Sequence, residues 1–151
     1  MTEEPVQPPS PNDPEFDDRE SAYELLQRGQ ALTRTRHYAQ AAVVLRRAAS
    51  LEPGKASILE ALARAEFNAG HHERASETFG ALLEVDPSSH YGHFGLGQSL
   101  RKLDRAREAW THLRLAVALS PGTALYRTTL ARLPDPRAGS EDLAASGEAD
   151  A

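Results

Sequence analysis

Apolar side chains recur at steps of three and four residues along most of this chain. In one stretch near the start they occupy Leu25, Leu32, Val44, Leu45 and Ala48. Such steps place side chains on one face of an α-helix, so the pattern predicts paired amphipathic helices. Turn residues separate the helical stretches at Pro53-Gly54, Asn68-Ala69-Gly70 and Pro121-Gly122. No segment reads as a strand, and we therefore expect an all-α fold.

The helical pattern repeats with a period of 34 residues. One period separates the members of three sets: Pro53, Pro87 and Pro121; Ala41, Ala75 and Ala109; and the small residues Gly29, Ala63 and Gly97. Small residues let two helices cross closely, and proline ends a helix at the junction between units. A unit of this length and pattern resembles the tetratricopeptide repeat, a helix-turn-helix unit that stacks into a superhelix.

The resemblance implies an α-α superhelix over residues 21–134. Its parts would be three repeats at 22–55, 56–89 and 90–123 and a capping helix at 124–133, in which Leu125, Tyr126, Leu130 and Leu133 cover the last repeat. Two departures fall in the middle unit. Leu82 stands at the position of Ala48 and Ala116, and Glu66 at that of Leu32 and Leu100. We expect the middle unit to be locally repacked.

Charge divides the chain into a basic body and two acidic ends. Residues 1–20 carry a net charge of −6 and residues 135–151 one of −4, while the whole chain is −5, which leaves +5 for residues 21–134. Both ends are rich in proline, glycine or serine and poor in apolar residues, so we expect disordered tails. The sequence has no cysteine, no signal-peptide pattern and no long apolar run. These absences favour a cytoplasmic protein outside the membrane, and the arginine- and alanine-rich composition is typical of GC-rich bacterial genomes.

The resemblance also implies a concave groove lined by the first helix of each unit. The inward positions would be Tyr23, Leu26, Gln30, Thr33, Arg34, Ser57, Glu60, Arg64, Phe67, Asn68, Tyr91, Phe94, Gln98, Arg101 and Lys102. This surface is aromatic and basic. It favours a peptide or partner helix that carries acids and a bulky apolar anchor. The alternative is that the aromatic residues pack between units and the arginines only face solvent.

The family's best-known peptide mode is a clamp of lysine, asparagine and arginine that holds the C-terminal carboxylate of heat-shock proteins. The equivalent positions here hold Leu26, Gln30, Ala61, Tyr91 and Gly95. The clamp residues are missing, so we do not expect this mode of binding.

Other chemistry is weakly represented. Gly92 and Gly95 suggest a phosphate-binding loop, but no strand precedes them, so this interpretation is disfavoured. In a helix interior each glycine should cost about 1 kcal/mol. We expect the two glycines to loosen this helix or to leave a pocket beside Tyr91 and Phe94. His90 and His93 lie one helical turn apart without a third ligand, so packing or surface roles are favoured over a metal site. No catalytic motif occurs, and we predict neither an enzyme nor a cofactor.

Three functions remain open at this point. The first is an adaptor or scaffold that binds a protein or peptide, as a monomer or weak dimer. The second is a small chaperone for a secreted or aggregation-prone client. The third, nucleic-acid binding by the basic body, is disfavoured because its bases are spread around the helices. A further hypothesis is that the acidic segment Pro14-Glu15-Phe16-Asp17-Asp18 competes for the groove; the favoured alternative is that this tail only keeps the protein soluble.

Overall fold

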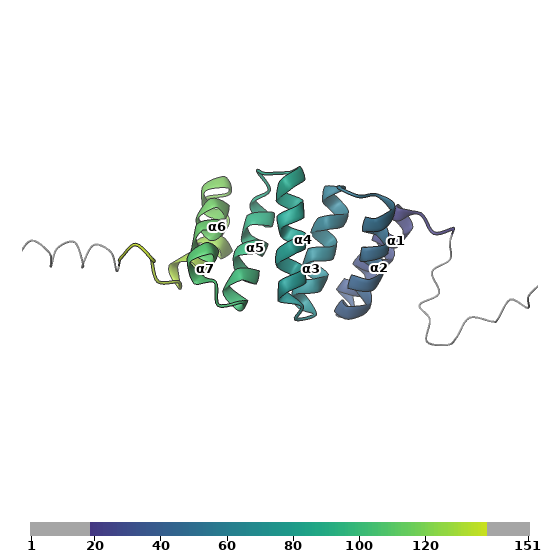
Figure 1. Cartoon of the computed structure of the whole chain (residues 1–151), viewed down its shortest axis with the longest axis horizontal. Helices are drawn as coiled ribbons and strands as arrows, with labels where there is room; N and C mark the ends of the chain where they lie inside the picture. Colours follow the sequence, from purple (N-terminus) through teal and green to yellow (C-terminus); the bar gives the residue numbers. More distant parts are fainter. Residues whose placement is uncertain (1–18, 139–151) are drawn as a thin grey trace, which may run out of the picture.

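The computed structural model describes residues 19–138, which form a single stack of seven helices (Figure 1). These are α1 Ala22–Arg34, α2 Tyr38–Leu51, α3 Ala56–Asn68, α4 His72–Val85, α5 His90–Lys102, α6 Ala106–Leu119 and α7 Ala124–Ala131. Residues 19–138 contain no strand, and the predicted all-α repeat fold is confirmed. The predictions for residues 1–18 and 139–151, including the tail segment that would compete for the groove, lie outside the described residues.

Helix ends follow local sequence signals. Ser21 accepts a hydrogen bond from the backbone N–H of Glu24, and the Glu24 carboxylate accepts one from the N–H of Ser21, which closes a capping box at the start of α1. The turn inside each unit places one residue in the left-handed region: Arg36, Gly70 and Asp104, at φ of 63°, 85° and 60°. These positions are one period apart. The turn predicted at Asn68-Ala69-Gly70 is confirmed, with Gly70 as a left-handed residue after α3.

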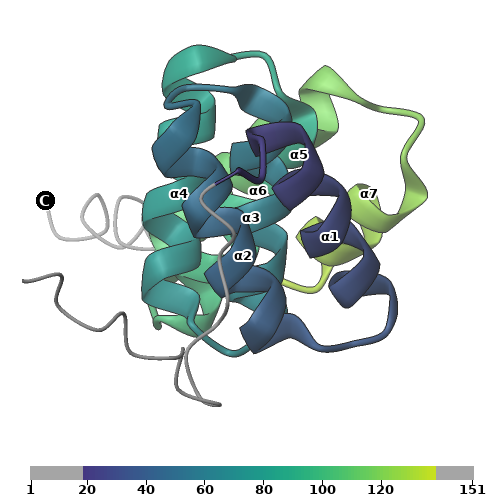
Figure 2. The ribbon, with the colours of Figure 1, turned by 90° about the vertical axis from the view of Figure 1, so that its right-hand side faces the viewer.

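The helices form two layers. Looking along the stack, α1 and α7 lie on one side and α2 and α4 on the other (Figure 2). Among the odd-numbered helices, α1 contacts α3 and α3 contacts α5. The even-numbered helices contact one another less. The odd-numbered layer is therefore the inner, more closely spaced side of the stack, and it carries the groove.

The repeated small residues lie where helices of one unit cross. Ala41, Ala75 and Ala109 are completely buried. A Cβ atom added to Gly29 would lie 2.4 Å from Leu45, and one added to Gly97 would lie 2.7 Å from Leu113. These glycines allow the close crossing that the repeat predicts.

The middle unit is repacked by exchanging large and small residues between neighbouring helices. Leu82 replaces an alanine, and Gly92 of α5 makes room for it and for the adjacent Leu83: a Cβ at Gly92 would lie 2.9 Å from Leu83 and 3.2 Å from Leu82. Between the first and middle units the arrangement is reversed. There the small residue is Ala48 of α2 and the large one is Ile58 of α3, and both are buried in one core cluster. Phe79 likewise replaces the leucine of the other units, and its ring would lie 2.2 Å from a Cβ at Gly95. Gly92 and Gly95 therefore fit the core of a helix that is continuous from His90 to Lys102.

Glu66 is the second departure, and its carboxylate is buried with partners from two other helices. The side chain is 2% exposed. Arg46 of α2 donates to it at 3.1 Å, and the hydroxyl of Thr78 of α4 donates at 2.7 Å. Buried charges require such pairing. The carboxylate thus links α2, α3 and α4 at the place where the other units have leucine.

The capping helix α7 differs from the expectation at one residue. Tyr126 and Thr129 are buried and Leu130 is partly buried, but Leu125 is 60% exposed. Leu125 lies one period after Tyr91, so its position faces the groove side rather than α6. The prediction that Leu125 covers the last repeat is wrong.

Candidate functional site

A cavity of about 200 Å³ opens between α3 and α5. It is lined by Arg64, Phe67 and Asn68 of α3, by Phe79 of α4, and by Tyr91, Phe94, Gly95 and Gln98 of α5. The two inner helices supply the walls. Phe79 comes from the outer layer and reaches the cavity past Gly95, where no side chain blocks it.

Ring contacts hold the walls of this cavity in place. Tyr91 packs edge-on against Phe79, with ring centroids 5.9 Å apart. Phe94 stacks on Tyr126 of α7 at 4.6 Å. The hydroxyl of Tyr126 is in turn 2.9 Å from Nδ1 of His90. Such aromatic pairs fix both position and orientation of the rings, so the capping helix supports the groove as well as the core.

Two polar atoms at the cavity lack hydrogen-bond partners. Nε of Arg64 and Oε1 of Gln98 are both buried, and neither bonds to any described residue. Arg64 and Gln98 lie one period apart at the position that Gln30 has in α1. Buried polar groups in folded proteins are nearly always paired.

Electrostatics around Tyr91 place further charges at the same site. Burial raises the pKa of the Tyr91 hydroxyl above its usual range, the positive charge of Arg64 opposes this rise, and Glu60 and Tyr126 add to it. The Glu60 carboxylate and the Arg64 guanidinium are thus both close enough to act on one phenol. The groove here is mixed in charge, and the bases Arg34, Arg101 and Lys102 lie in the last turns of α1 and α5.

The structure brings part of the predicted groove together. Six of the fifteen candidate residues line the cavity, namely Arg64, Phe67, Asn68, Tyr91, Phe94 and Gln98. Eight others do not line it but are exposed or partly exposed: Tyr23, Gln30, Thr33, Arg34, Ser57, Glu60, Arg101 and Lys102. Leu26 is the exception, because it is 7% exposed and belongs to a core cluster with Ile58 and Ala61 of α3. It contributes to packing between α1 and α3.

Sequence reasoning missed two residues of the site, Phe79 and Tyr126. A usable signal existed for Phe79: it is larger than its equivalents Leu45 and Leu113, and the following helix has Gly95 where the others have Ala61 and Thr129. Tyr126 lies on the capping helix, whose side chains were expected to serve only the core.

Comparison of the sequence with protein families now settles what kind of repeat this is. The family model of the tetratricopeptide repeat matches residues 32–94, which contain the whole middle unit, and the helices on both sides keep the same period. Residues 32–94 thus match the tetratricopeptide repeat (TPR) family, and the fold of the described residues is that of a TPR superhelix. A search of curated proteins finds no match to the sequence.

Solved TPR structures share the fold at low identity. The first TPR of Spaghetti (RPAP3), bound to the HSP90 peptide SRMEEVD, is 18% identical, with a TM-score of 0.70 over 82% of this chain and 94% of that one. The Sgt2 TPR domain from Aspergillus fumigatus is 20% identical, with a TM-score of 0.69 over 86% and 85%. YrrB, a TPR protein with an unusual peptide-binding site, is 20% identical, with a TM-score of 0.70 over 74% and 58%. At these identities the likeness concerns the fold alone.

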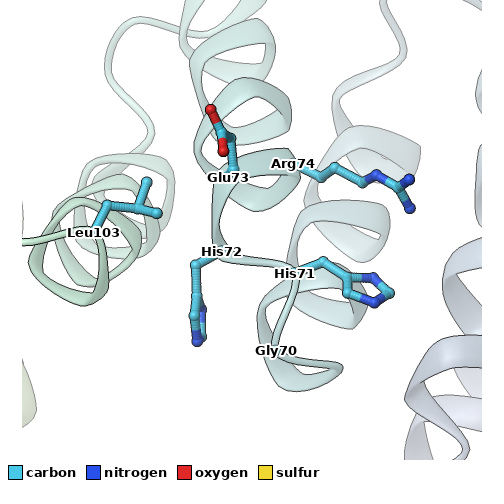
Figure 3. Close-up of a pocket in the computed structure, with 6 residues that line it drawn as sticks. All are labelled: Gly70, His71, His72, Glu73, Arg74 and Leu103. Atoms are coloured by element: carbon cyan, nitrogen blue, oxygen red, sulfur yellow. The ribbon is translucent and has the colours of Figure 1, made fainter.

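A second hollow of the TPR stack, of about 440 Å³, lies outside the groove. Figure 3 shows its residues, Gly70, His71, His72, Glu73, Arg74 and Leu103. His72 and Leu103 lie on the same side of the turn, whereas His71 and Arg74 point away from Leu103 (Figure 3). A similar hollow, lined by Arg36, His37, Tyr38, Ala39, Gln40 and Ala69, occurs one period earlier. The repeated geometry of the stack accounts for both, and they do not join the groove.

The histidines of the last TPR unit pack between helices. His93 stacks on His112 of α6 with ring centroids 5.4 Å apart and the two Nδ1 atoms 3.1 Å apart. Nε2 of His93 is 2.9 Å from the carbonyl oxygen of Pro87 and must donate to it, so its Nδ1 accepts from His112. Within residues 19–138, no three potential metal ligands come together. In the same range, no helix has the length and apolar character of a membrane span.

Proposed function

We propose that this TPR protein is an interaction module that binds a peptide or a partner helix in the groove formed by α1, α3, α5 and α7. The observation that carries the proposal is the cavity between α3 and α5, which four aromatic rings line together with Arg64, Asn68 and Gln98. Aromatic residues and arginine are the side chains that most often dominate binding at protein interfaces.

Charge at one margin of the groove supports an acidic ligand. Arg34 lies in the last turn of α1, and Arg101 and Lys102 lie in the last turn of α5. All three are at least partly exposed. A ligand whose apolar anchor enters the cavity would extend acidic residues toward these bases. Rim charges of this kind mainly increase the association rate and fix orientation.

Peptide complexes of structural neighbours give independent support for the mode of binding. The second TPR domain of human RPAP3 was solved with the HSP70 peptide SGPTIEEVD, and the first TPR of Spaghetti with SRMEEVD. Both peptides are short and acidic. Here the ligand would meet different side chains, because Tyr91 and Gly95 stand at clamp positions.

Selection from a random peptide library displayed on phage tests the proposal, followed by calorimetry with the selected peptides. We expect micromolar binding that Arg64→Glu weakens by about tenfold or more, because the reversed charge faces the ligand. Arg107→Glu is the matched control, since Arg107 is an exposed residue of α6 outside the groove. Failure to enrich any peptide, or equal losses in the two variants, would contradict binding in the groove.

A further inference from the structure

We infer that the partner of the groove is an acidic amphipathic helix that lies along the stack and crosses α1, α3, α5 and α7. The inference rests on the proposed function and specifies which kind of segment binds. It starts from two exposed apolar side chains. Tyr23 of α1 and Leu125 of α7 are 65% and 60% exposed, more than any other large apolar residue among residues 19–138.

These two side chains belong to one row at the beginnings of the inner helices. Tyr23, Tyr91 and Leu125 have the same place in the repeat, and we call them the apolar row; Ser57 stands at that place in α3. Tyr91 also lines the cavity. The row therefore extends over the whole groove, with the cavity beside its middle. Exposed apolar surface that is aligned in this way is typical of an interaction site.

A second row, of bases, lies at the opposite ends of the same helices. Arg34, Arg101 and Lys102 are in the last turns of α1 and α5, and Arg132 follows α7. Tyr91 and Lys102 are about 16 Å apart along the axis of α5, at about 1.5 Å per residue. A ligand helix with its side chains is about 10–12 Å wide. It would reach both rows, because the long basic side chains extend toward it.

The spacing of the inner helices suits a helical ligand. Packed helices have axes about 8–10 Å apart, and α1 contacts α3 as α3 contacts α5. Two turns of a ligand helix advance about 11 Å, so residues seven apart on one edge would meet successive inner helices at equivalent places. In an extended strand, side chains on one edge recur about every 6.7 Å, which does not match the stack.

Charge determines which edge of the ligand faces which row. Besides burial, the negative charge of Glu60 raises the pKa of the hydroxyls of Tyr91 and Tyr126, so Glu60 acts beside the apolar row. A ligand acid on this side would meet a like charge. On the other side it would meet four bases, none of which forms an ion pair within residues 19–138. The acidic edge of the helix therefore faces the bases.

The library selection gives the first test, with random peptides of about 20 residues, which span about 30 Å as a helix. Selected peptides should carry apolar residues at helical spacing with acids along one side of them, and circular dichroism should show that they gain helicity on binding. If no peptide is selected, the proposed function fails as well. If the peptides bind without gaining helicity, or if half of the peptide keeps full affinity, the inference is overturned while groove binding stands.

Variants at the two ends of the apolar row give the second test. Tyr23→Ser and Leu125→Ser should each weaken binding of a selected peptide by about fivefold or more, because each removes an apolar contact far from the cavity. Leu115→Ser is the matched control, since Leu115 is 41% exposed but lies on α6, outside the groove. It should leave the affinity unchanged. If Arg64→Glu weakens binding but neither row variant does, the ligand occupies the cavity alone and the inference is overturned.

Charge exchange between the partners tests the orientation. Lys102→Glu should weaken binding by about tenfold, and a peptide with lysine in place of one acid should recover most of this loss. The same peptide should gain nothing with Arg107→Glu, because Arg107 is an exposed base of α6 outside the groove. Circular dichroism checks that each variant is folded. If no exchange of an acid for lysine restores binding to Lys102→Glu, the acids do not face the bases and the inference is overturned.

Discussion

At the scale of single residues, the pair His93 and His112 couples packing to protonation. His93 donates Nε2–H to the backbone and accepts at Nδ1 from His112. Burial lowers the pKa of His112, the neighbouring His93 lowers it further, and Glu108 acts in the opposite direction. The folded protein therefore holds His112 neutral more firmly than the unfolded chain does.

This arrangement predicts a loss of stability in mild acid. A folded pKa below the unfolded value of about 6.5 means that the unfolded chain binds more protons, so the free energy of unfolding falls as the pH drops below that value. Urea denaturation at about pH 7.5 and about pH 5.5 measures the change. His112→Gln, which keeps a donor for His93 but does not titrate, should lose clearly less stability over this interval. Equal losses in wild type and variant would assign the pH dependence to other groups.

Single residues also show which features of the fold could be predicted from the sequence alone. Gly70 and the buried alanines could be predicted because each recurs, in kind or in position, at the 34-residue step. The burial of Leu26 could not be predicted, because it depends on how closely α1 approaches α3. The repeat period alone does not specify that distance. Phe79 reaches the groove for a similar reason. Its path is opened by Gly95, which lies in another unit and becomes its neighbour only in the folded stack.

At the scale of helices, α4 and α5 approach each other closely because a large residue on one meets a small residue on the other. Phe79 lies against Gly95, and Leu82 against Gly92. Each glycine costs α5 some helix propensity. The close packing offsets this cost, and it leaves α5 regular over its whole length.

Gly95→Ala should destabilise the protein by roughly 1–3 kcal/mol, because the added Cβ overlaps the Phe79 ring and overpacking exceeds the gain in helix propensity. In a Phe79→Leu background, the same change should be neutral or stabilising by up to about 1 kcal/mol. Gly80→Ala is the control within α4, since nothing lies within 4 Å of its added Cβ; it should raise stability. Denaturant titrations measure the wild type, the three single variants and the double variant. A destabilising effect that persists in the Phe79→Leu background would contradict the pairing.

At the scale of the whole molecule, each helix is stabilised mainly by contacts with the helices next to it in the stack. Each helix packs mainly against the next, and α7 closes one end of the stack. Through Tyr126, it also supports Phe94 and His90 of the groove. Solenoids of this kind lose order locally when an end is removed.

Truncation after Thr123, which removes α7, should therefore lower the free energy of unfolding by about 2 kcal/mol or more, as expected from losing a buried tyrosine and the surface it covers. Hydrogen exchange should accelerate in α5 and α6 and remain unchanged in α1 and α2. Peptide affinity should also fall, since Phe94 loses its stacking partner. Uniform acceleration along the stack would show that the seven helices unfold as one unit.

The exchange of large and small residues between units also determines their order. Ala48 precedes Ile58, whereas Leu82 precedes Gly92. Joining the first unit directly to the third would bring Ala48 toward Gly92 and leave a void. A second copy of the middle unit would bring Leu82 toward Ile58 and create a clash. The units share one backbone plan, but their junctions are not interchangeable: a rearranged gene with the same period and the same helices would encode a chain that packs poorly.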